Sequence, residues 1–236
     1  MDSVLGIGII TRNRLDGLRR CVTEVERRTL GQYFMMIADD GSEDGTVEWA
    51  SCQGIPVVTG PRRGIAWNKN RALFFLLEMT TCDPILLLED DTWPNLSGWD
   101  TVWVRAAEQW GHVNLDGSTT SWDSRVWAHG PGTADQPLSS RHYTGCCTIT
   151  SRDALRKVGF LNSRFRGYGW EHIEWTNRFY QYYQQSWELP SGMLPTLEHG
   201  VLLANAGASS FNRDEAALSE SVYLELIGAQ AATPGA

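Results

Sequence analysis

Short apolar runs alternate with longer segments of helical periodicity along the first half of the chain. The runs have the length of strands and contain few polar residues, which is typical of strands buried on both faces of a sheet. At 15–25 and 64–79, apolar residues instead recur at helical spacing. This alternation predicts an α/β fold with a mostly parallel sheet, right-handed crossovers and helices on both faces. The strand-like runs are 4–10, 33–38, 55–58 and 85–88.

The second half of the chain has a weaker pattern. We expect helices at 99–110 and at 152–158, the latter capped by Ser151, and a strand at 142–150. Residues 114–141 are rich in Gly, Ser, Thr, Asp and Pro. That composition predicts a long loop or an irregular hairpin, of the kind that often shapes a binding site.

Composition and charge indicate a globular protein and narrow its partners. The 236 residues are 42% apolar and 20% charged, and the net charge of −8 argues against wholesale electrostatic binding to nucleic acid or to an anionic membrane. The five cysteines are odd in number and lack the spacing of a metal site, so we expect reduced thiols. Neither a signal-peptide pattern nor an 18-residue apolar run is present, and we therefore expect a cytoplasmic protein without a membrane segment.

Three consecutive carboxylates, Glu89, Asp90 and Asp91, follow the fourth strand-like run. They fall at the carboxyl end of a strand, which is the edge of an open α/β sheet where ligands bind. Adjacent acids repel one another unless a positive charge binds beside them, and a hard divalent cation carrying a diphosphate is a natural occupant. The alternative is a solvated acidic turn.

Polar residues also follow the second strand and open the next long helix. Asp39 and Asp40 lie where hydrogen bonds to a nucleotide base or ribose are expected, although turn formation and helix capping explain the same residue types. Asn68, Lys69 and Arg71 fall in the early turns of the helix that begins near Gly64. A helix N-terminus with such side chains suits a diphosphate.

A later helix begins with Glu171 and His172, directly after Gly167 and Gly169. Acids in a first helical turn are stabilised by the helix dipole, which is the structural explanation of the pattern. The functional explanation is a catalytic acid or base held at a rigid position. The pattern leaves both explanations open.

Four segments follow one another along the chain: Asp39 to Thr46, Gly64 to Leu73, Glu89 to Asp91 and Gly167 to Glu174. Together and in this order, they resemble the family-2-type glycosyltransferases, which have the GT-A fold. Residues 145–179 are also similar to the C-terminal part of galactosyltransferases, whose pattern is Gly-Trp-Gly-Gly-Glu-Asp. The resemblance covers about residues 4–200. It implies a nucleotide-sugar donor, with a UDP-sugar preferred, a Mn²⁺ or Mg²⁺ ion, and transfer with inversion at the anomeric carbon.

Carried onto this sequence, the resemblance makes Asp91 the direct metal ligand and His199 a further ligand. Glu171 takes the Glu position of the Glu-Asp pair, and His172 takes the Asp position, where the family usually has its general base. That substitution is the main departure from the family pattern, and it leaves either residue as the base. The residues expected to bind the donor nucleotide are Thr11, Arg12, Asp39, Asp40, Asn68, Arg71 and Asp90.

The acceptor is expected to be a glycan or a small molecule, as in most of the family. Basic residues interleaved with aromatic residues leave a second option, namely hydroxylated bases in nucleic acid. Arg164, Arg166 and Trp170 would then lie on the acceptor side, with Trp122 and Trp127 upstream.

The alternative of another class is a nucleotide-sugar-binding module without turnover, which would not need Glu171 or His172. A nucleotidyltransferase is disfavoured because no glycine-rich loop follows the first strand. We expect one GT-A-like domain at 1–225, with a frayed tail at 226–236. Within it, the donor-binding half is expected at about 1–95 and the acceptor and catalytic half at about 96–205.

Overall fold

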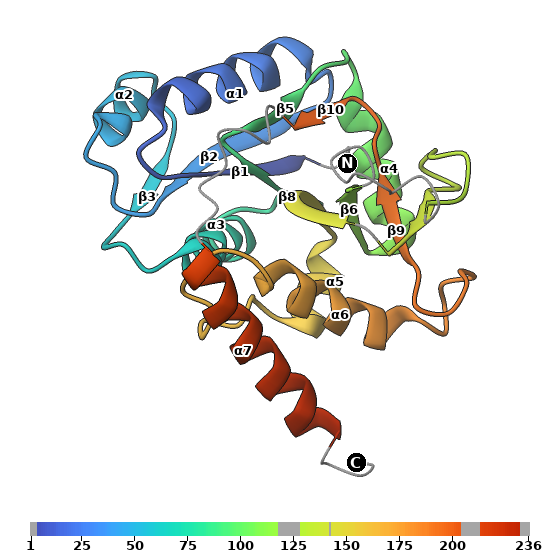
Figure 1. Cartoon of the computed structure of the whole chain (residues 1–236). Helices are drawn as coiled ribbons and strands as arrows, with labels where there is room; N and C mark the ends of the chain where they lie inside the picture. The colour runs from blue at the N-terminus through green and yellow to red at the C-terminus, as the bar shows by residue number, and fades with distance from the viewer. Residues whose placement is uncertain (1–3, 118–127, 142, 204–212, 232–236) are drawn as a thin grey trace.

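The computed structural model describes residues 4–117, 128–141, 143–203 and 213–231. An eight-stranded sheet runs through the middle of the molecule and is covered by helices on both faces (Figure 1). In spatial order its strands are β3 (Val57–Thr59), β2 (Tyr33–Asp39), β1 (Leu5–Thr11), β4 (Ile85–Glu89), β8 (Tyr143–Thr150), β6 (His112–Asp116), β9 (Leu194–Leu197) and β7 (Leu138–Ser140).

The sheet is mixed, with its parallel part at the N-terminal side. Strands β3, β2, β1 and β4 pair in parallel, and β6 pairs in parallel with β9. Strand β8 lies antiparallel to both β4 and β6, and β7 lies antiparallel to β9. The predicted α/β architecture with a mostly parallel sheet and helices on both faces is therefore confirmed, with β8 as the antiparallel strand that joins the two parallel parts.

Alternate side chains of each central strand enter two separate cores. In β4, Leu86 and Leu88 pack into the core on one face, while Ile85 and Leu87 pack into the core on the other. Because both faces are covered, the strand reads in the sequence as an unbroken apolar run. Helices α1 (Leu15–Arg28), α2 (Thr46–Cys52) and α4 (Trp99–Trp110) cover the first core, and α3 (Ile65–Glu78), α5 (Arg152–Val158) and α6 (Glu171–Tyr183) cover the second (Figure 1).

The segment 114–141, predicted as a loop or irregular hairpin, contains the end of one sheet strand and the whole of another. Strand β6 extends to Asp116, β7 follows at Leu138–Ser140, and His129 forms an isolated bridge with Ser139. Trp122 and Trp127 lie outside the described residues.

A second, two-stranded sheet lies beside the main one. Strand β5 (Thr92–Pro94) directly follows the acidic turn and pairs antiparallel with β10 (Val201–Leu203), with Val201 opposite Pro94. Since β5 continues from Glu89–Asp91, this pairing fixes the direction in which the chain leaves the acidic turn.

The C-terminal segment forms helix α7 (Arg213–Ala231), which packs across the start of α6 and then projects away from the sheet (Figure 1). Residues 226–231 of the expected frayed tail belong to α7, and 232–236 lie outside the described residues. Throughout the described ranges, none of the helices combines the length and the apolar character that crossing a membrane requires.

His112 is a buried, neutral histidine in the second core. Its ring stacks on Phe179 with 3.8 Å between centroids, and its Nε2 lies 3.2 Å from Thr176 Oγ1. The side chain is only 1% exposed, and burial lowers the pKa of His112 to about 3. The folded protein therefore keeps this imidazole unprotonated at pH values where an unfolded chain would protonate it.

Acid should destabilise the fold through this residue. Between the unfolded histidine pKa of about 6.5 and the folded value, the unfolded state binds one proton more than the folded state, so stability is complete above pH 6.5 and falls as the pH is lowered. The expected loss is about 1.4 kcal/mol per pH unit, or roughly 2 kcal/mol between pH 6.5 and 5. Urea unfolding across this range should give a smaller pH slope for His112→Gln; equal slopes would contradict the assignment.

Candidate functional site

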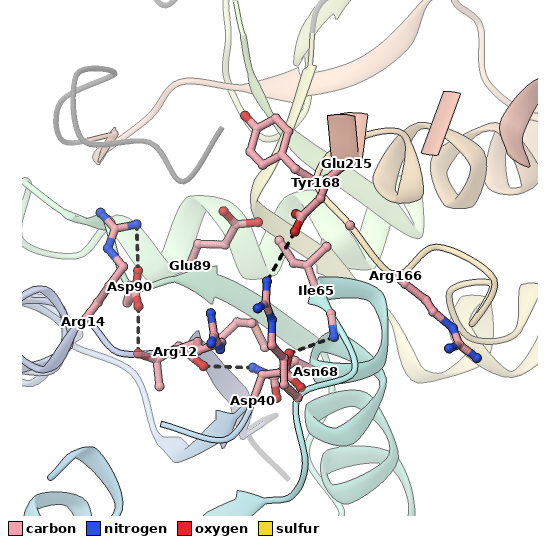
Figure 2. A pocket seen from close by; sticks show the side chains of 15 residues that line it. Arg12, Arg14, Asp40, Ile65, Asn68, Glu89, Asp90, Arg166, Tyr168 and Glu215 are labelled. Carbon is pink, nitrogen blue, oxygen red and sulfur yellow. Dashed lines mark hydrogen bonds and ion pairs between the residues drawn. The ribbon is translucent and has the colours of Figure 1, made fainter. Parts of the chain in front are cut away.

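A cavity of about 270 Å³ opens at the carboxyl ends of β1 and β4 (Figure 2). Its walls come from the ends of these strands, from the start of α3, from the loop that precedes α6 and from Glu215 at the start of α7. The residues that line it include Thr11, Arg12, Arg14, Asp40, Arg62, Asn68, Glu89, Asp90, Arg166 and Tyr168.

The loop before α6 closes this cavity by resting directly on Gly64. Gly64 has φ +92°, and a Cβ added there would lie 2.0 Å from the carbonyl oxygen of Arg166. Glycine is therefore required both by the backbone conformation and by the close approach. The contact joins the donor-binding and acceptor halves predicted from the sequence.

The acidic end of β4 gathers metal-binding atoms. Glu89, Asp91 and Cys146 bring two carboxylate oxygens and a thiol sulfur within 4.8 Å of one another. Burial, followed by the nearby charge of Glu89, raises the pKa of Asp91, although Arg14 Nη1 lies 2.9 Å from its Oδ2. A divalent cation would relieve this repulsion, and carboxylate oxygens suit Mn²⁺ or Mg²⁺, so the residues present fit the ion.

Asp90 faces the other way, toward the end of β1. Thr11 Oγ1 donates a hydrogen bond of 2.7 Å to Asp90 Oδ2, and Arg14 Nη1 lies 3.3 Å from Asp90 Oδ1. Burial of this carboxyl group, which is 4% exposed, raises the pKa of Asp90 to about 7. Asp90 thus ties β1 to β4 at the cavity wall, and it stands outside the group of metal-binding atoms.

Asp39 and Asp40 are both occupied by structural hydrogen bonds. Asp39 is fully buried and accepts bonds from the backbone N–H groups of Gly41 and Ser42 and from Thr59 Oγ1. Asp40 accepts bonds from the backbone N–H groups of residues 63 and 64 at 2.9 and 2.8 Å. Asp40 lines the cavity, whereas Asp39 is absent from its lining and shapes the turn.

Asn68 and Arg71 hold the same loop from the side of α3. Asn68 Nδ2 donates to the carbonyl oxygens of Thr11 and Ala38, which lie near the carboxyl ends of the neighbouring strands β1 and β2. Arg71 donates to Asp40 Oδ1 at 2.8 Å and to Pro61 O at 2.8 Å. Asn68 borders the cavity, and Arg71 supports its wall from behind.

Arg12 differs from these residues because one of its buried nitrogen atoms has no hydrogen-bond partner in the described part of the chain. Arg12 lines the cavity, and this nitrogen atom is Nε of its guanidinium group. A guanidinium group in this position is available to an anionic ligand.

Lys69, which the sequence placed with Asn68 and Arg71 in the early turns of α3 and beside a diphosphate, forms two buried ion pairs in the structure. Its side chain is 2% exposed, and Nζ lies 2.8 Å from Glu89 Oε1 and 3.2 Å from Glu171 Oε1. The sequence contains a signal for the burial of this lysine, because Lys69 lies four residues after Ile65 and four before Leu73, inside the apolar stripe of α3. A lysine on a buried helical face is almost always paired with an acid.

Glu171 and His172 stand at the start of α6, where Glu171 shares the ammonium group of Lys69 with Glu89. Glu171 is 2% exposed, and its Oε1 lies 3.3 Å from His172 Nδ1. Burial alone would raise the pKa of Glu171, but the charges of Lys69 and His172 outweigh it and hold the pKa well below its usual range. Glu171 is therefore an ionised carboxylate with little affinity for a proton.

His199, predicted as a further metal ligand, precedes β10 in the chain. It lies beyond the far end of the β5–β10 ladder, where its carbonyl oxygen accepts a hydrogen bond from Trp103 Nε1. Among the described residues, the metal-binding atoms that gather here come from Glu89, Asp91 and Cys146. The role of His199 as a further metal ligand stays a prediction.

The residues predicted for the acceptor side mostly contact helix α7. Arg164 forms an ion pair with Glu225, and the ring of Trp170 stacks on Tyr223 with 4.9 Å between centroids. Arg166 borders the cavity through its backbone loop, and its side chain points away from the other labelled side chains (Figure 2).

Comparisons with known proteins bear on the family and the fold of this chain. The sequence model described as glycosyl transferase family 2 matches residues 7–159. No curated protein sequence matches the chain significantly.

Many solved structures share the fold. GalNAc-T7 with UDP, GalNAc and Mn²⁺ has a TM-score of 0.69 at 14% identity, over 96% of this chain and 48% of its own. Mannosyltransferase PcManGT from Pyrobaculum calidifontis with GDP-Man and Mn²⁺ has a TM-score of 0.56 at 14% identity, over 82% of this chain and 53% of its own. Glucosyl-3-phosphoglycerate synthase from Mycobacterium tuberculosis with Mn²⁺, UDP and glucosyl-3-phosphoglycerate has a TM-score of 0.61 at 15% identity, over 96% of this chain and 80% of its own.

The chain spans about half the length of the first two of these proteins. At such low identities, the likeness to solved structures shows the GT-A fold alone. The family match is stronger, because it covers 7–159 of 236 residues and contains the acidic end of β4. This chain belongs to glycosyl transferase family 2.

Proposed function

We propose that this chain is a metal-dependent, inverting glycosyltransferase that moves a sugar from a nucleoside-diphosphate donor to an acceptor hydroxyl group. The observation that carries the proposal is the meeting of two acidic groups through one lysine. Lys69 Nζ lies 2.8 Å from Glu89 Oε1 at the end of β4 and 3.2 Å from Glu171 Oε1 at the start of α6. The groups that would bind a metal ion and the groups that would handle the acceptor proton thus share one edge of the sheet.

The donor nucleotide occupies the cavity at the ends of β1 and β4 in this proposal. Arg12 supplies a guanidinium group whose Nε has no hydrogen-bond partner among the described residues, and Asp40 and Asn68 border the same space. GalNAc-T7 and the mycobacterial synthase were solved with UDP, and PcManGT with GDP-Man, which supports a nucleoside diphosphate and favours uridine. Residues 1–95 then recognise the donor, and 96–205 hold the acceptor and the catalytic base.

Asp91 is the proposed ligand of a Mn²⁺ or Mg²⁺ ion, with Glu89 as a second carboxylate within 4.8 Å. When bound, such an ion neutralises the charge that accumulates on the leaving diphosphate. The three structures described above that share the fold each contain Mn²⁺, which supports Mn²⁺ as the first ion to test.

His172 is the proposed general base. Glu171 is buried and its pKa is held below the usual range, so it is poorly suited to accept a proton. His172 Nδ1 lies 3.3 Å from Glu171 Oε1, and when Nδ1–H donates to this carboxylate, Nε2 is left with a free lone pair. The acceptor hydroxyl then loses its proton to Nε2 as its oxygen attacks the anomeric carbon and the nucleoside diphosphate leaves.

The acceptor is proposed to be a glycan or another small molecule. The basic and aromatic residues that suggested a nucleic acid acceptor are largely engaged, since Arg164 pairs with Glu225 and Trp170 stacks on Tyr223. We therefore do not extend the proposal to nucleic acid.

The proposal is tested with a panel of nucleotide sugars. We expect the purified chain with Mn²⁺ to release nucleoside diphosphate from one donor in the panel, and release should accelerate when a suitable hydroxyl acceptor is added. The sugar product should carry the anomeric configuration opposite to that of the donor, as read by NMR. Tight binding of a donor without release or transfer would instead identify a binding module.

A further inference from the structure

We infer that Lys69 is a positioning residue of the transfer reaction: its ammonium group fixes Glu171, and through Glu171 the imidazole of His172, relative to the acidic end of β4. The inference rests on the proposed function, because it gives His172 a proton to accept. Its structural part, the orientation of His172 by Lys69, can be measured without any turnover.

The hydrogen bonds of Lys69 are complete. An ammonium group has three N–H donors and no acceptor. Nζ of Lys69 meets Glu89 Oε1 at 2.8 Å, the carbonyl oxygen of Gly145 at 3.0 Å and Glu171 Oε1 at 3.2 Å. These partners come from β4, β8 and α6, so one buried cation joins three elements that are distant in the sequence.

Glu171 passes this constraint to His172. The same oxygen, Oε1, faces both Lys69 Nζ and His172 Nδ1, at 3.2 and 3.3 Å. A carboxylate oxygen held in place by a cation is a fixed acceptor, and it selects the imidazole tautomer that carries hydrogen on Nδ1. The order Lys69–Glu171–His172 follows the general arrangement in which a base is oriented by a third group.

Strand β8 limits how far these groups can move. A Cβ added to Gly145 would lie 2.8 Å from both Cβ and Cγ of His172 and 2.9 Å from Lys69 Nζ. Such separations are shorter than real Cβ contacts, so the backbone of β8 already touches both side chains. The imidazole and the ammonium group are therefore packed against a common wall as well as being joined through Glu171.

The buried negative charge of Glu171 depends on the positive charge of Lys69 beside it. Glu171 is 2% exposed, and its Oε2 has no hydrogen-bond partner among the described residues. Without Lys69, Glu171 would stay buried with only the imidazole of His172 beside its carboxylate, which favours its neutral, protonated form. A protonated Glu171 can donate to His172 Nδ1 and so select the opposite tautomer.

The test compares Lys69→Met with the wild-type chain and with Lys157→Met, a control in which the lysine is exposed and pairs with Asp153. The ¹⁵N NMR signals of His172, assigned with His172→Gln, should report the Nδ1–H tautomer in the wild type and in the control. Lys69→Met should lose that tautomer. In transfer assays its kcat should fall about 100-fold, while the donor KM changes less than about threefold, because misplacing a reacting group by about 1 Å has an effect of that order.

A second variant secures the test if Lys69→Met does not fold. Glu171→Leu removes the connecting carboxylate while Lys69 keeps Glu89 and Gly145 as partners. It too should lose the Nδ1–H tautomer. An unchanged tautomer in the folded variant would overturn the inference. A changed tautomer with no transfer by the wild type, for any donor, would instead count against the proposed function while leaving the orientation by Lys69 in place.

Discussion

Replacing Asp91 with alanine should abolish metal-dependent transfer while leaving the fold intact. Asp91 is the proposed primary ligand, and a bound divalent ion contributes several kcal/mol to the stabilisation of a leaving diphosphate. We expect kcat/KM to fall about 1000-fold, which corresponds to about 4 kcal/mol of lost transition-state stabilisation. The fold should persist because Arg14, which lies 2.9 Å from Asp91, retains Asp90 at 3.3 Å as a partner.

The measurement for Asp91→Ala is a titration of Mn²⁺ by calorimetry together with initial transfer rates. Asp135→Ala is a matched control, because Asp135 is an exposed aspartate that pairs with Arg105 away from the cavity. The control should bind Mn²⁺ and transfer sugar like the wild type. If the wild-type chain kept its full transfer rate in excess chelator, the reaction would not depend on a metal ion and this prediction would be wrong.

The second large effect is expected for His172→Ala. A positioned general base contributes about 10²- to 10⁴-fold to a rate, so kcat should fall within this range. The donor KM should change little, because His172 is absent from the lining of the donor cavity. His129→Ala is the matched control, since His129 bridges Ser139 in a different part of the sheet.

The comparison that assigns the base is between His172→Ala and Glu171→Ala, each measured across the pH range. If His172 is the base, only His172→Ala should remove the acidic limb of the kcat/KM profile, because Glu171 stays ionised there. An unchanged rate and profile for His172→Ala would transfer the role to Glu171. Wild-type rates for both variants would place the base elsewhere.

The sequence predicts the parallel part of the fold because each of its strands is recognisable on its own. Strands β1, β2 and β4 are buried on both faces, so each reads as an apolar run without reference to its neighbours. Strand β9 and the small sheet of β5 and β10 have three or four residues each, and their pairing partners are distant in the sequence. Helix α7 has apolar residues around its whole circumference, so no single face marked it as a helix.

The candidate site shows the same division between local and distant information. The acids at the end of β4 and at the start of α6 could be found from their positions in single elements. The ion pairs of Lys69 could not, because they depend on how α3, β4 and α6 meet. The position of His199 is of the same kind, since this residue precedes β10 and the pairing of two short strands decides where it lies.

The position of β8 in the sheet has a consequence for synthesis on the ribosome. β8 is the only strand, within the described part of the chain, that joins β4 to β6, and it is made after both of them. Until Thr150 has emerged, the apolar strand β4 has an unpaired edge that can pair with the wrong chain. The sheet is completed only when β4 pairs with β8, which lies about 60 residues later in the sequence. Contacts between residues so far apart form slowly. Nascent chains that stall between β4 and β8 would therefore be the species that most need a chaperone.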